Sequence, residues 1–331
     1  MRIGLISTGV PFAGGGSRLL VGGLHEKLVE RGHRVELLHL SFLDVPDELL
    51  PQMAALRMMR LDDYFERVIT FPQAHAVRHR CKIVWFAHSL HISTDHKNPV
   101  AAALTEADTA ALGEAHRVFT TSRAAGDRLR RFNGVESELL YPLAPYPELF
   151  RTGPYGDEIV VICRMAPHRR QLLMIDAVAQ TRSPIRIRFC GTEMVPGYAE
   201  ILRDAASRHG ITSRVTIEAR WITEEEKAAR LEHALAVAYL PSCEEGDVYP
   251  AIEAAHARRC TVTVADTGGV TEFVRDGVTG LVTAPEPAAL AAAFDRLYAD
   301  RALAAQLGEA AAAQAAALGT SWDAVLEKLL S

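Results

Sequence analysis

Apolar residues nowhere run far enough in this chain to cross a membrane. The opening run, residues 3–6, is much shorter than the roughly 20 residues that a membrane-spanning helix needs. It is also too short for the apolar core of a secretory signal, and no later run reaches membrane length. We therefore expect a soluble, cytoplasmic protein, with peripheral membrane contact as an open alternative.

The chain also lacks a surplus of positive charge. Its 36 Lys and Arg residues are outnumbered by 41 Asp and Glu residues, which gives a formal net charge of −5. Proteins that bind nucleic-acid duplexes usually carry a strong basic excess. The charge balance therefore argues against a nucleic-acid partner.

Residues with the spacing of a metal site are missing as well. No two cysteines form a CxxC pair, and His88, His91 and His96 have neither the helical HxxxH spacing nor matching carboxylates. The pair Asp62–Asp63 lies in a stretch of helical pattern, and we interpret it as a solvated face. The sequence thus predicts no metal site. We expect buried thiols in a reducing compartment at the five cysteines, Cys81, Cys163, Cys190, Cys243 and Cys260.

Apolar runs of strand length alternate with helical patterns along the whole chain. This alternation predicts parallel sheets covered by helices, and 331 residues suit two domains of about 150 residues each. The proline-rich stretch 141–147 breaks the pattern and predicts a linker between two doubly wound α/β halves. We expect helices at 19–31 and from about 122 to 131. The expected strands are 3–7, 35–40, 67–71, 82–87, 117–121, 158–163, 185–190, 215–218, 236–240, 261–264 and 280–282.

The most informative segment is residues 241–254, PSCEEGDVYPAIEA. It follows an apolar strand and opens a helix, where Pro250 suits the first turn because its missing N–H is no loss. Free amides at a helix start can receive an anion such as a phosphate. Glu253, a turn further in, can accept hydrogen bonds from a ribose diol, and Glu245 is placed to meet a sugar. The alternative is an acidic loop followed by an exposed glutamate.

A basic segment, residues 164–170 (RMAPHRR), follows another apolar strand. Its three arginines, Arg164, Arg169 and Arg170, suit a diphosphate, because a guanidinium grips phosphate in a bidentate fork. The alternative is a solvated basic loop. Ligands of doubly wound folds bind beyond the carboxyl ends of the strands, so we expect the site in the cleft between the two halves.

Two glycine-rich turns and a histidine complete the candidate site. Residues 11–17, PFAGGGS, include Gly15 and Gly16 and offer a phosphate cradle or a flexible loop. No lysine follows as in GxxxxGK[ST], which argues against a P-loop ATPase. The pair Gly268–Gly269 offers free amides or a plain turn. His88 follows the strand at 82–87 and can hydrogen-bond a reacting sugar, or it is an ordinary histidine at the end of a strand.

Four arginines cluster in one expected helix of the first half: Arg123, Arg128, Arg130 and Arg131. Such clusters are typical of a solvated face. The alternative is a surface that docks on anionic lipid or on an acidic acceptor.

Taken in order, these segments resemble the family-four glycosyltransferases, the glycosyl transferases of group 1. The resemblance covers essentially the whole chain, and its most specific element is the E-x7-E spacing of Glu245 and Glu253. Further likenesses are found at Gly15–Gly16, 31–33, Ser122–Arg123, 140–142, 266–269, 276–282 and Trp322–Asp323.

The resemblance implies a GT-B fold, in which two Rossmann-like domains face each other across a cleft. Residues 1–150 would form the acceptor-side domain and 151–311 the domain that binds the nucleotide sugar. A final segment, 312–331, would carry the helix that crosses back to the first domain.

The resemblance also implies a retaining, metal-independent hexosyltransferase whose only co-substrate besides the acceptor is a nucleotide-diphosphate sugar, with UDP or GDP favoured. The acceptor would be a hydroxyl of a glycan, a lipid or a natural product. Arg164 and Arg169 would hold the diphosphate, Glu253 the ribose, and His88 would lie near the anomeric carbon. Glu245 would face the transferred sugar. The remaining donor-binding residues implied are Gly15, Gly16, Gly191, Arg220, Gly246, Asp247, Val248 and Tyr249.

Several positions depart from the family pattern and keep other functions open. Arg169 replaces a lysine, Arg18 replaces an acidic residue, and Arg258 and Cys260 replace glycine and proline. Arg18 and Arg169 favour a non-catalytic sugar-nucleotide-binding protein. A nucleotide-sugar epimerase is a further alternative on this fold, although the E-x7-E spacing does not support it. A phosphorylase needs a lysine for pyridoxal phosphate. The second half offers only Lys227 and Lys328, neither of which follows a strand, and this argues against a phosphorylase.

Overall fold

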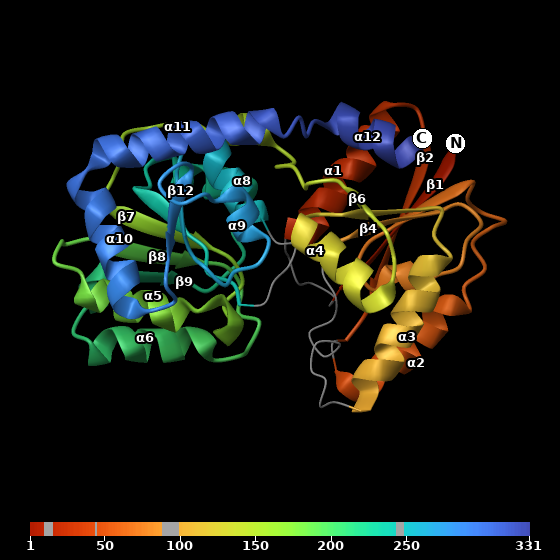
Figure 1. Ribbon diagram of the computed structural model, residues 1–331, viewed down its shortest axis with the longest axis horizontal. Coiled ribbons are helices and arrows are strands. Elements are labelled where there is room, and N and C mark those ends of the chain that lie inside the picture. Colours follow the sequence, from red (N-terminus) through yellow and green to blue (C-terminus); the bar gives the residue numbers. More distant parts are fainter. Residues whose placement is uncertain (10–15, 44, 88–98, 243–247) are drawn as a thin grey trace. The chain divides into compact units, whose positions relative to one another are not determined.

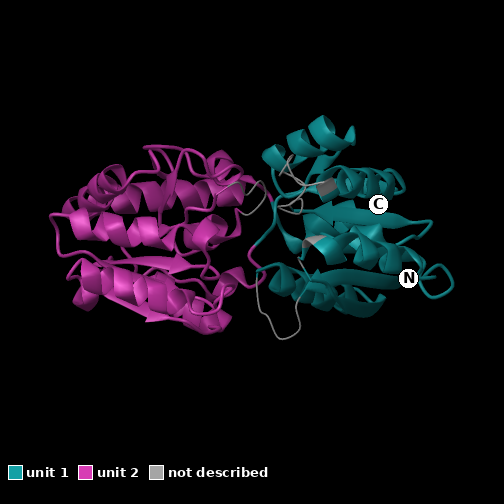
Figure 2. Ribbon diagram, turned by 90° about the horizontal axis from the view of Figure 1, so that it is seen from below, with its two compact units in different colours: residues 1–143, 245–247, 320–331 teal, residues 144–244, 248–319 magenta. Residues whose placement is uncertain are grey.

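The computed structural model describes residues 1–9, 16–43, 45–87, 99–242 and 248–331 (Figure 1). They divide into two compact units (Figure 2). Unit 1 contains the described residues up to Leu143 together with Thr320–Ser331, and unit 2 contains those from Ala144 to Gly319. The chain enters unit 2 inside the proline-rich segment 141–147 and leaves it after Gly319, whereas the sequence placed the boundaries after residues 150 and 311.

Unit 1 is built on a six-stranded parallel sheet in the order β2-β1-β3-β4-β5-β6. Its strands are β1 (Arg2–Gly9), β2 (Arg34–Ser41), β3 (Arg67–Thr70), β4 (Lys82–Phe86), β5 (Arg117–Thr120) and β6 (Glu138–Leu139). Its helices are α1 (Gly16–Glu30), α2 (Pro46–Arg57), α3 (Pro99–Gly113), α4 (Arg123–Arg128) and, from the far end of the chain, α12 (Trp322–Leu330), with short turns η1 (Ala74–Ala76) and η3 (Leu129–Asn133).

Unit 2 repeats the plan with the strand order β12-β11-β10-β7-β8-β9, again parallel throughout. Its strands are β7 (Glu158–Ile162), β8 (Arg186–Cys190), β9 (Val215–Glu218), β10 (Ala236–Ala238), β11 (Thr261–Val264) and β12 (Gly280–Thr283). Its helices are α5 (Gln171–Gln180), α6 (Tyr198–Arg208), α7 (Glu224–Glu232), α8 (Tyr249–His256), α9 (Val270–Phe273), α10 (Pro287–Ala299) and α11 (Arg301–Ala317), with short turns η4 (Pro147–Leu149), η5 (Pro167–Arg169) and η6 (Thr212–Arg214).

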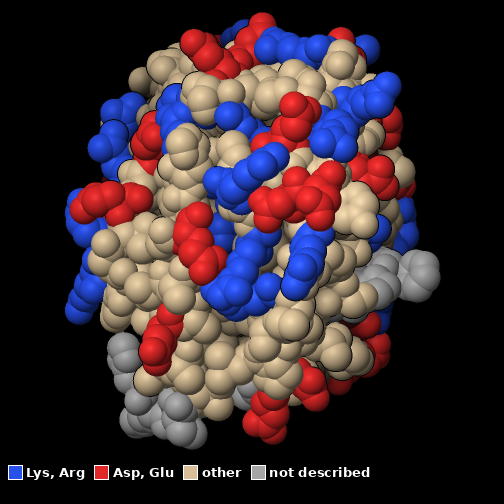
Figure 3. Space-filling model, turned by 90° about the vertical axis from the view of Figure 1, so that its right-hand side faces the viewer, with Lys and Arg blue, Asp and Glu red and all other residues tan. Residues whose placement is uncertain are grey.

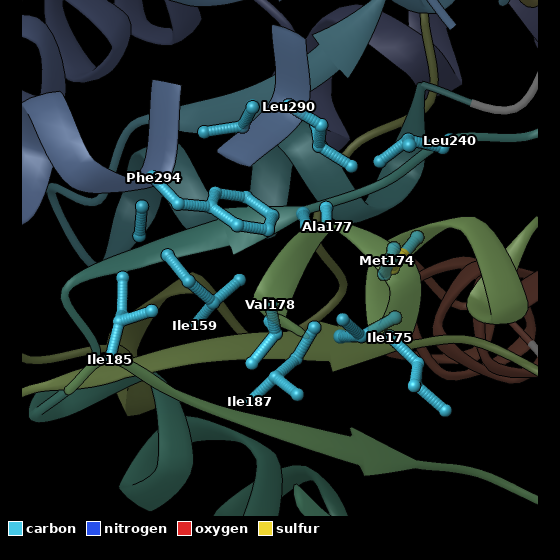
Figure 4. Packing of buried hydrophobic residues seen from close by; sticks show 14 of the residues in the cluster. Ile159, Met174, Ile175, Ala177, Val178, Ile185, Ile187, Leu240, Leu290 and Phe294 are labelled. Carbon is cyan, nitrogen blue, oxygen red and sulfur yellow. The ribbon is translucent and has the colours of Figure 1, made fainter. Parts of the chain in front are cut away.

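Burial on both faces of the sheets explains why the strands are continuously apolar. Every residue of β4 and of β11 is buried, whereas β2, at the edge of its sheet, is largely exposed. In unit 2, α5 and α10 cover one face of the sheet, and Figure 4 shows Val178 and Phe294 meeting Ile159 and Ile187 there. In unit 1, Val325, Leu326 and Leu329 of α12 join the core around β1 and α1.

The structure confirms the predicted α/β class and all eleven predicted strands to within two residues at each end. It adds β6, whose two residues are too short to show a pattern. Two local predictions were wrong. The pair Asp62–Asp63 lies in a turn, where Asp62 Oδ1 accepts a hydrogen bond from the Arg80 amide at 2.9 Å. The helix expected up to residue 131 is regular only to Arg128 and continues as the π-helical turn η3.

The backbone at Arg258 has a conformation that suits glycine better than arginine. Arg258 follows α8 with a φ of 54°, in the left-handed region that costs an L-residue roughly 1–2 kcal/mol. Its guanidinium pairs with Glu309, and both side chains are about half exposed, so the pair contributes only about 0–1 kcal/mol.

We expect Arg258→Gly to raise the free energy of unfolding by about 0.5 kcal/mol, because the relief of the left-handed backbone exceeds the loss of an exposed ion pair. The measurement is the midpoint of urea unfolding. Glu309→Gln serves as the control that removes the ion pair alone and should lower the midpoint slightly. A lower midpoint for Arg258→Gly than for Glu309→Gln would contradict this account.

Candidate functional site

The strand order of unit 2 creates one point where the chain reverses its direction of winding. From β7 the chain builds outward through β8 to β9, and it then returns to β10 on the other side of β7. The loops that follow β7 and β10 therefore diverge, and ligands of open α/β sheets bind in the crevice at such a switch point. The two motif segments of the sequence, 164–170 and 241–254, follow these two strands.

The loop after β7 carries three arginines with different surroundings. The Arg164 side chain is exposed, and no group in the described parts of the chain offers it a hydrogen bond or an ion pair. Gln171 at the start of α5 fixes the backbone beneath it, since its Nε2 donates to the Arg164 carbonyl at 3.1 Å and its Oε1 accepts from the Ala166 amide at 3.4 Å. Arg164 thus presents a free guanidinium from an anchored backbone.

The next two arginines are engaged within unit 2. Arg169 is only 6% exposed, donates to the Tyr239 hydroxyl, and lies 5.4 Å from the centre of the Tyr239 ring. Arg170 forms a bidentate pair with Asp266 at 2.5 and 2.7 Å, and the guanidinium lowers the pKa of that carboxyl. The sequence grouped all three arginines as candidates for diphosphate binding; the structure takes Arg170 out of that group.

A direct contact joins the two motif segments. The amide and the hydroxyl of Ser242 both donate to the carbonyl of His168, at 2.8 and 3.1 Å. The loop after β10 is therefore held against the loop after β7 a few residues before α8 begins. Figure 1 shows α8 and the carboxyl ends of the sheet strands in unit 2.

Glu253 on α8 is buried, not exposed as the alternative interpretation of this segment supposed. It is 2% exposed, and its Oε1 lies 2.6 Å from the Nζ of Lys227 on α7. Lys227 also pairs with Glu224 at 2.8 Å and lies 5.9 Å from the centre of the Tyr249 ring. Burial alone would lower the pKa of Lys227, but the two carboxylates raise it above its ordinary value.

Lys227 is the residue that the sequence analysis missed at this site. It was weighed only as a lysine for pyridoxal phosphate and set aside because it does not follow a strand. A signal was present: Lys227, Ala228 and Leu231 form the buried face of α7, and a lysine at helical spacing among apolar residues indicates a buried partner of opposite charge.

Gly191 and Arg220 follow β8 and β9 at the same edge of the sheet. Gly191 has a φ of 146°, and a Cβ at this position would overlap the carbonyl oxygen of Cys163, so glycine permits the close approach of two loops. The Arg220 guanidinium donates to Glu226 at 2.6 Å and, together with the Thr223 amide, lowers the pKa of Glu226 to about 2. The Arg220 side chain is thus committed to the start of α7.

Several predicted site residues lie outside the described residues: Gly15, His88, Glu245, Gly246 and Asp247. Three others are placed. Gly16 is the first residue of α1 in unit 1, whereas Val248 and Tyr249 are buried at the start of α8 in unit 2. Gly268 has a φ of 63° just before α9, so this pair of glycines does include a turn that needs glycine.

The sheet of unit 1 has its own switch point, between β1 and β3. There the Thr8 hydroxyl donates to the Pro72 carbonyl at 2.9 Å and to Gln73 Oε1 at 3.2 Å. Gln73 has a φ of 65°, which is uncommon for a residue other than glycine and persists where neighbouring groups hold it. No sequence pattern indicates this pair, because the contact joins two segments far apart in the chain.

The arginine cluster of unit 1 is partly satisfied by its own segment. Arg130 pairs with Asp127, and the guanidinium groups of Arg128 and Arg131 lie 4.7 and 5.1 Å from the centre of the Phe132 ring. On the face of unit 1 that Figure 3 shows, acidic and basic side chains are interspersed. These contacts favour a solvated face over a dedicated surface for docking on anionic lipid or on an acidic acceptor.

Three features of the described residues bear on metal, membrane and thiol chemistry. They contain no cluster of three His, Cys, Asp or Glu side chains arranged to hold a metal ion. None of their helices has both the length and the apolar character that crossing a bilayer requires. Cys81, Cys163, Cys190 and Cys260 are free thiols, and burial raises the pKa of Cys190 and of Cys260 to about 12.

Part of the chain is similar to a known protein family. Residues 156–300 match the family described as glycosyl transferases group 1. The chain is 29% identical over 272 residues to D-inositol 3-phosphate glycosyltransferase of Streptomyces bingchenggensis, and the match covers 71% of this chain and 58% of the relative. The chain thus spans less than two thirds of the length of the curated relatives it matches.

Solved structures share the fold over nearly the full chain. Sucrose-phosphate synthase of Thermosynechococcus elongatus superposes with a TM-score of 0.82 at 20% identity, covering 99% of this chain and 97% of that one. HepE of Anabaena, solved in complex with UDP and glucose, superposes with a TM-score of 0.78 at 18% identity, covering 98% and 99%. At these identities the likeness establishes the fold.

Proposed function

We propose that this chain, whose residues 156–300 match the glycosyl transferases of group 1, is a glycosyltransferase that moves a hexose-type sugar from a nucleotide-diphosphate sugar to a hydroxyl group of a glycan, lipid or natural-product acceptor. The observation that carries this proposal is the junction of the two motif segments at the switch point of unit 2, where Ser242 binds the His168 carbonyl at 2.8 Å. UDP is the first candidate nucleotide, since HepE, which shares the fold, was solved with UDP and glucose. GDP is the second.

In this proposal each group acts on one part of the donor. The free guanidinium of Arg164 and the buried one of Arg169 neutralise the diphosphate, and Glu253 accepts hydrogen bonds from the ribose diol. The start of α8, with Val248 and Tyr249, supplies amides toward the donor. Gly191 and the backbone at Arg220 border the base. The residues outside the described ranges keep their proposed roles: Gly15 beside the donor, Glu245, Gly246 and Asp247 at the sugar, and His88 near the anomeric carbon.

Transfer breaks the bond between the anomeric carbon and the phosphate oxygen and forms a bond to the acceptor oxygen. Positive charge develops on the sugar and negative charge on the leaving diphosphate, which Arg164 and Arg169 stabilise. The acceptor proton passes to the leaving phosphate, so that attack from the same face retains the anomeric configuration. This scheme requires neither a metal ion nor a cofactor. We place the acceptor at the carboxyl edge of the unit 1 sheet, beside Gly16, Thr8 and Gln73.

We also propose a reducing, cytoplasmic setting, which the free thiols Cys81, Cys163, Cys190 and Cys260 support. A lipid acceptor would bring the protein to a membrane surface by peripheral contact.

The test is a thermal-shift screen of the purified chain against UDP-, GDP-, ADP- and dTDP-sugars in the presence of EDTA. A ligand at about 100 times its dissociation constant adds about 2.7 kcal/mol of stability, so the matching nucleotide sugar should raise the melting temperature clearly. Glu253→Gln should abolish most of the shift, whereas Glu200→Gln on the exposed face of α6 should preserve it.

The outcomes separate the candidate functions. If no nucleotide sugar raises the melting temperature at millimolar concentration, the proposal is wrong. If one binds but no acceptor in a screen of glycans, lipids and small polyols is glycosylated, a non-catalytic sugar-nucleotide-binding protein is favoured. Isomerisation of the donor sugar without any acceptor would indicate an epimerase. NMR of a transfer product would test retention through the configuration at the anomeric carbon.

A further inference from the structure

Three ionised side chains are buried together where α7 packs against α8. Lys227 is 7% exposed at its side chain, and its partners Glu224 and Glu253 are 8% and 3% exposed. The Lys227 Nζ lies 2.8 Å from a Glu224 oxygen and 2.6 Å from Glu253 Oε1. One cation thus serves two carboxylates, one on its own helix and one on the helix that carries the E-x7-E glutamate.

The helix segment that carries Lys227 is held on both sides of this residue. The helix α7 starts with a capping box, in which the Glu226 amide donates to the Thr223 hydroxyl and the Glu226 carboxylate accepts the Thr223 amide. Beyond Lys227, Ala228 and Leu231 pack in one apolar cluster with Ala254 and Ala257 around α8. The ammonium therefore approaches Glu253 from a rigid helix.

The two carboxylates also act on the ionisation of Lys227. Burial by itself lowers the pKa of Lys227, but Glu253 and Glu224 outweigh it and raise the pKa. A buried carboxylate needs a charged, hydrogen-bonded partner, since otherwise it becomes neutral. Lys227 supplies that partner to Glu253.

We infer that Lys227 is a positioning residue for the donor: it keeps Glu253 ionised and in one rotamer so that the carboxylate selects nucleotides with an intact ribose diol. The inference rests on the proposed role of Glu253 as the ribose acceptor. It assigns to α7, which carries no motif of the sequence, a part in donor selection.

The experiment compares two probes by calorimetric titration: UDP and 2′,3′-dideoxy-UDP, or the GDP pair if GDP is the nucleotide found by screening. Hydrogen bonds to a charged group are worth about 10- to 100-fold in affinity, so wild type should bind UDP more tightly than the dideoxy form by about that factor. Lys227→Met should lose most of this preference, because UDP binding weakens while dideoxy-UDP binding changes by no more than a few-fold.

Three variants keep the result interpretable. Glu224→Gln leaves the Lys227–Glu253 pair intact and should retain the ribose preference. Lys227→Arg keeps the charge and should restore part of it. The double variant Lys227→Met/Glu224→Leu removes the cation together with Glu224, whose one ion-pair partner among the described residues is Lys227, so it measures the same loss should the single variant fail to fold.

An equal loss of affinity for UDP and dideoxy-UDP in Lys227→Met, or no loss for either, would assign Lys227 to the fold alone and overturn the inference. These results differ from a failure of the proposed function. If wild type binds neither nucleotide, both the proposed function and the inference about Lys227 are wrong. If wild type binds UDP and dideoxy-UDP equally, the ribose role of Glu253 and this inference fall, while the role of the arginines at the diphosphate stands.

Discussion

Replacing Arg164 by methionine is expected to lower kcat for sugar transfer by about 100- to 1000-fold, the loss typical of removing one preorganised charge donor from the leaving group. The side chain is exposed and has no partner in the described parts of the chain, so its removal leaves the folded unit intact. Steady-state release of the nucleotide diphosphate measures the effect once the donor is known.

Arg170 provides the matched control within the same loop. Its guanidinium is held by Asp266 at 2.5 and 2.7 Å, so Arg170→Met should reduce stability slightly and leave kcat within a few-fold of wild type. Circular dichroism is the control that checks whether both variants fold. A loss below about tenfold for Arg164→Met, or equal losses for the two variants, would show that Arg164 does not stabilise the leaving diphosphate.

The second large effect concerns stability. Gly308 lies on α11 where this helix crosses the end of α8, and a Cβ at Gly308 would overlap the carbonyl oxygen of Arg258 and lie 3.1 Å from the Tyr155 hydroxyl. That same carbonyl accepts the Tyr155 hydroxyl at 2.8 Å, so it cannot turn away without losing a hydrogen bond. We expect Gly308→Ala to reduce the free energy of unfolding by about 2 kcal/mol, because overpacking exceeds the better helix propensity of alanine.

Gly22→Ala on α1 is the control for helix propensity. A Cβ at Gly22 would meet nothing within 4 Å, so this variant should gain up to about 1 kcal/mol. Thermal melts should then move in opposite directions, with a decrease of about 4–8 °C for Gly308→Ala. A neutral or stabilised Gly308→Ala would mean that α11 can shift away from α8 at little cost.

The sequence predicted the central strands well because they are buried on both faces. Runs such as Glu158–Ile162 leave no alternative to a central strand once flanking turns are recognised. Only β6 escaped, since two residues at a sheet edge carry no periodicity. Helix ends were less accurate, because the change to a π-helical turn after Arg128 depends on local packing and not on composition.

The site was predicted as a set of segments, and its internal pairing was not. Chain order placed Arg164, Arg169 and Glu253 after strands, which is enough to bring them to one edge of a parallel sheet. Whether an arginine is free depends on a partner elsewhere in the chain, such as Asp266 for Arg170. Lys227 likewise became visible only when α7 and α8 were seen to pack together, because 26 positions separate it from Glu253.

The placement of α12 in unit 1 has a consequence for synthesis on the ribosome. Domains usually fold in the order in which they are made. Here the core of unit 1, which includes Ile3 and Leu5, also needs Val325, Leu326 and Leu329, whereas the residues of unit 2 all lie between them, from Ala144 to Gly319. The unit that is begun first is therefore finished last, and the apolar face of β1 and α1 stays uncovered until Leu329 has left the exit tunnel.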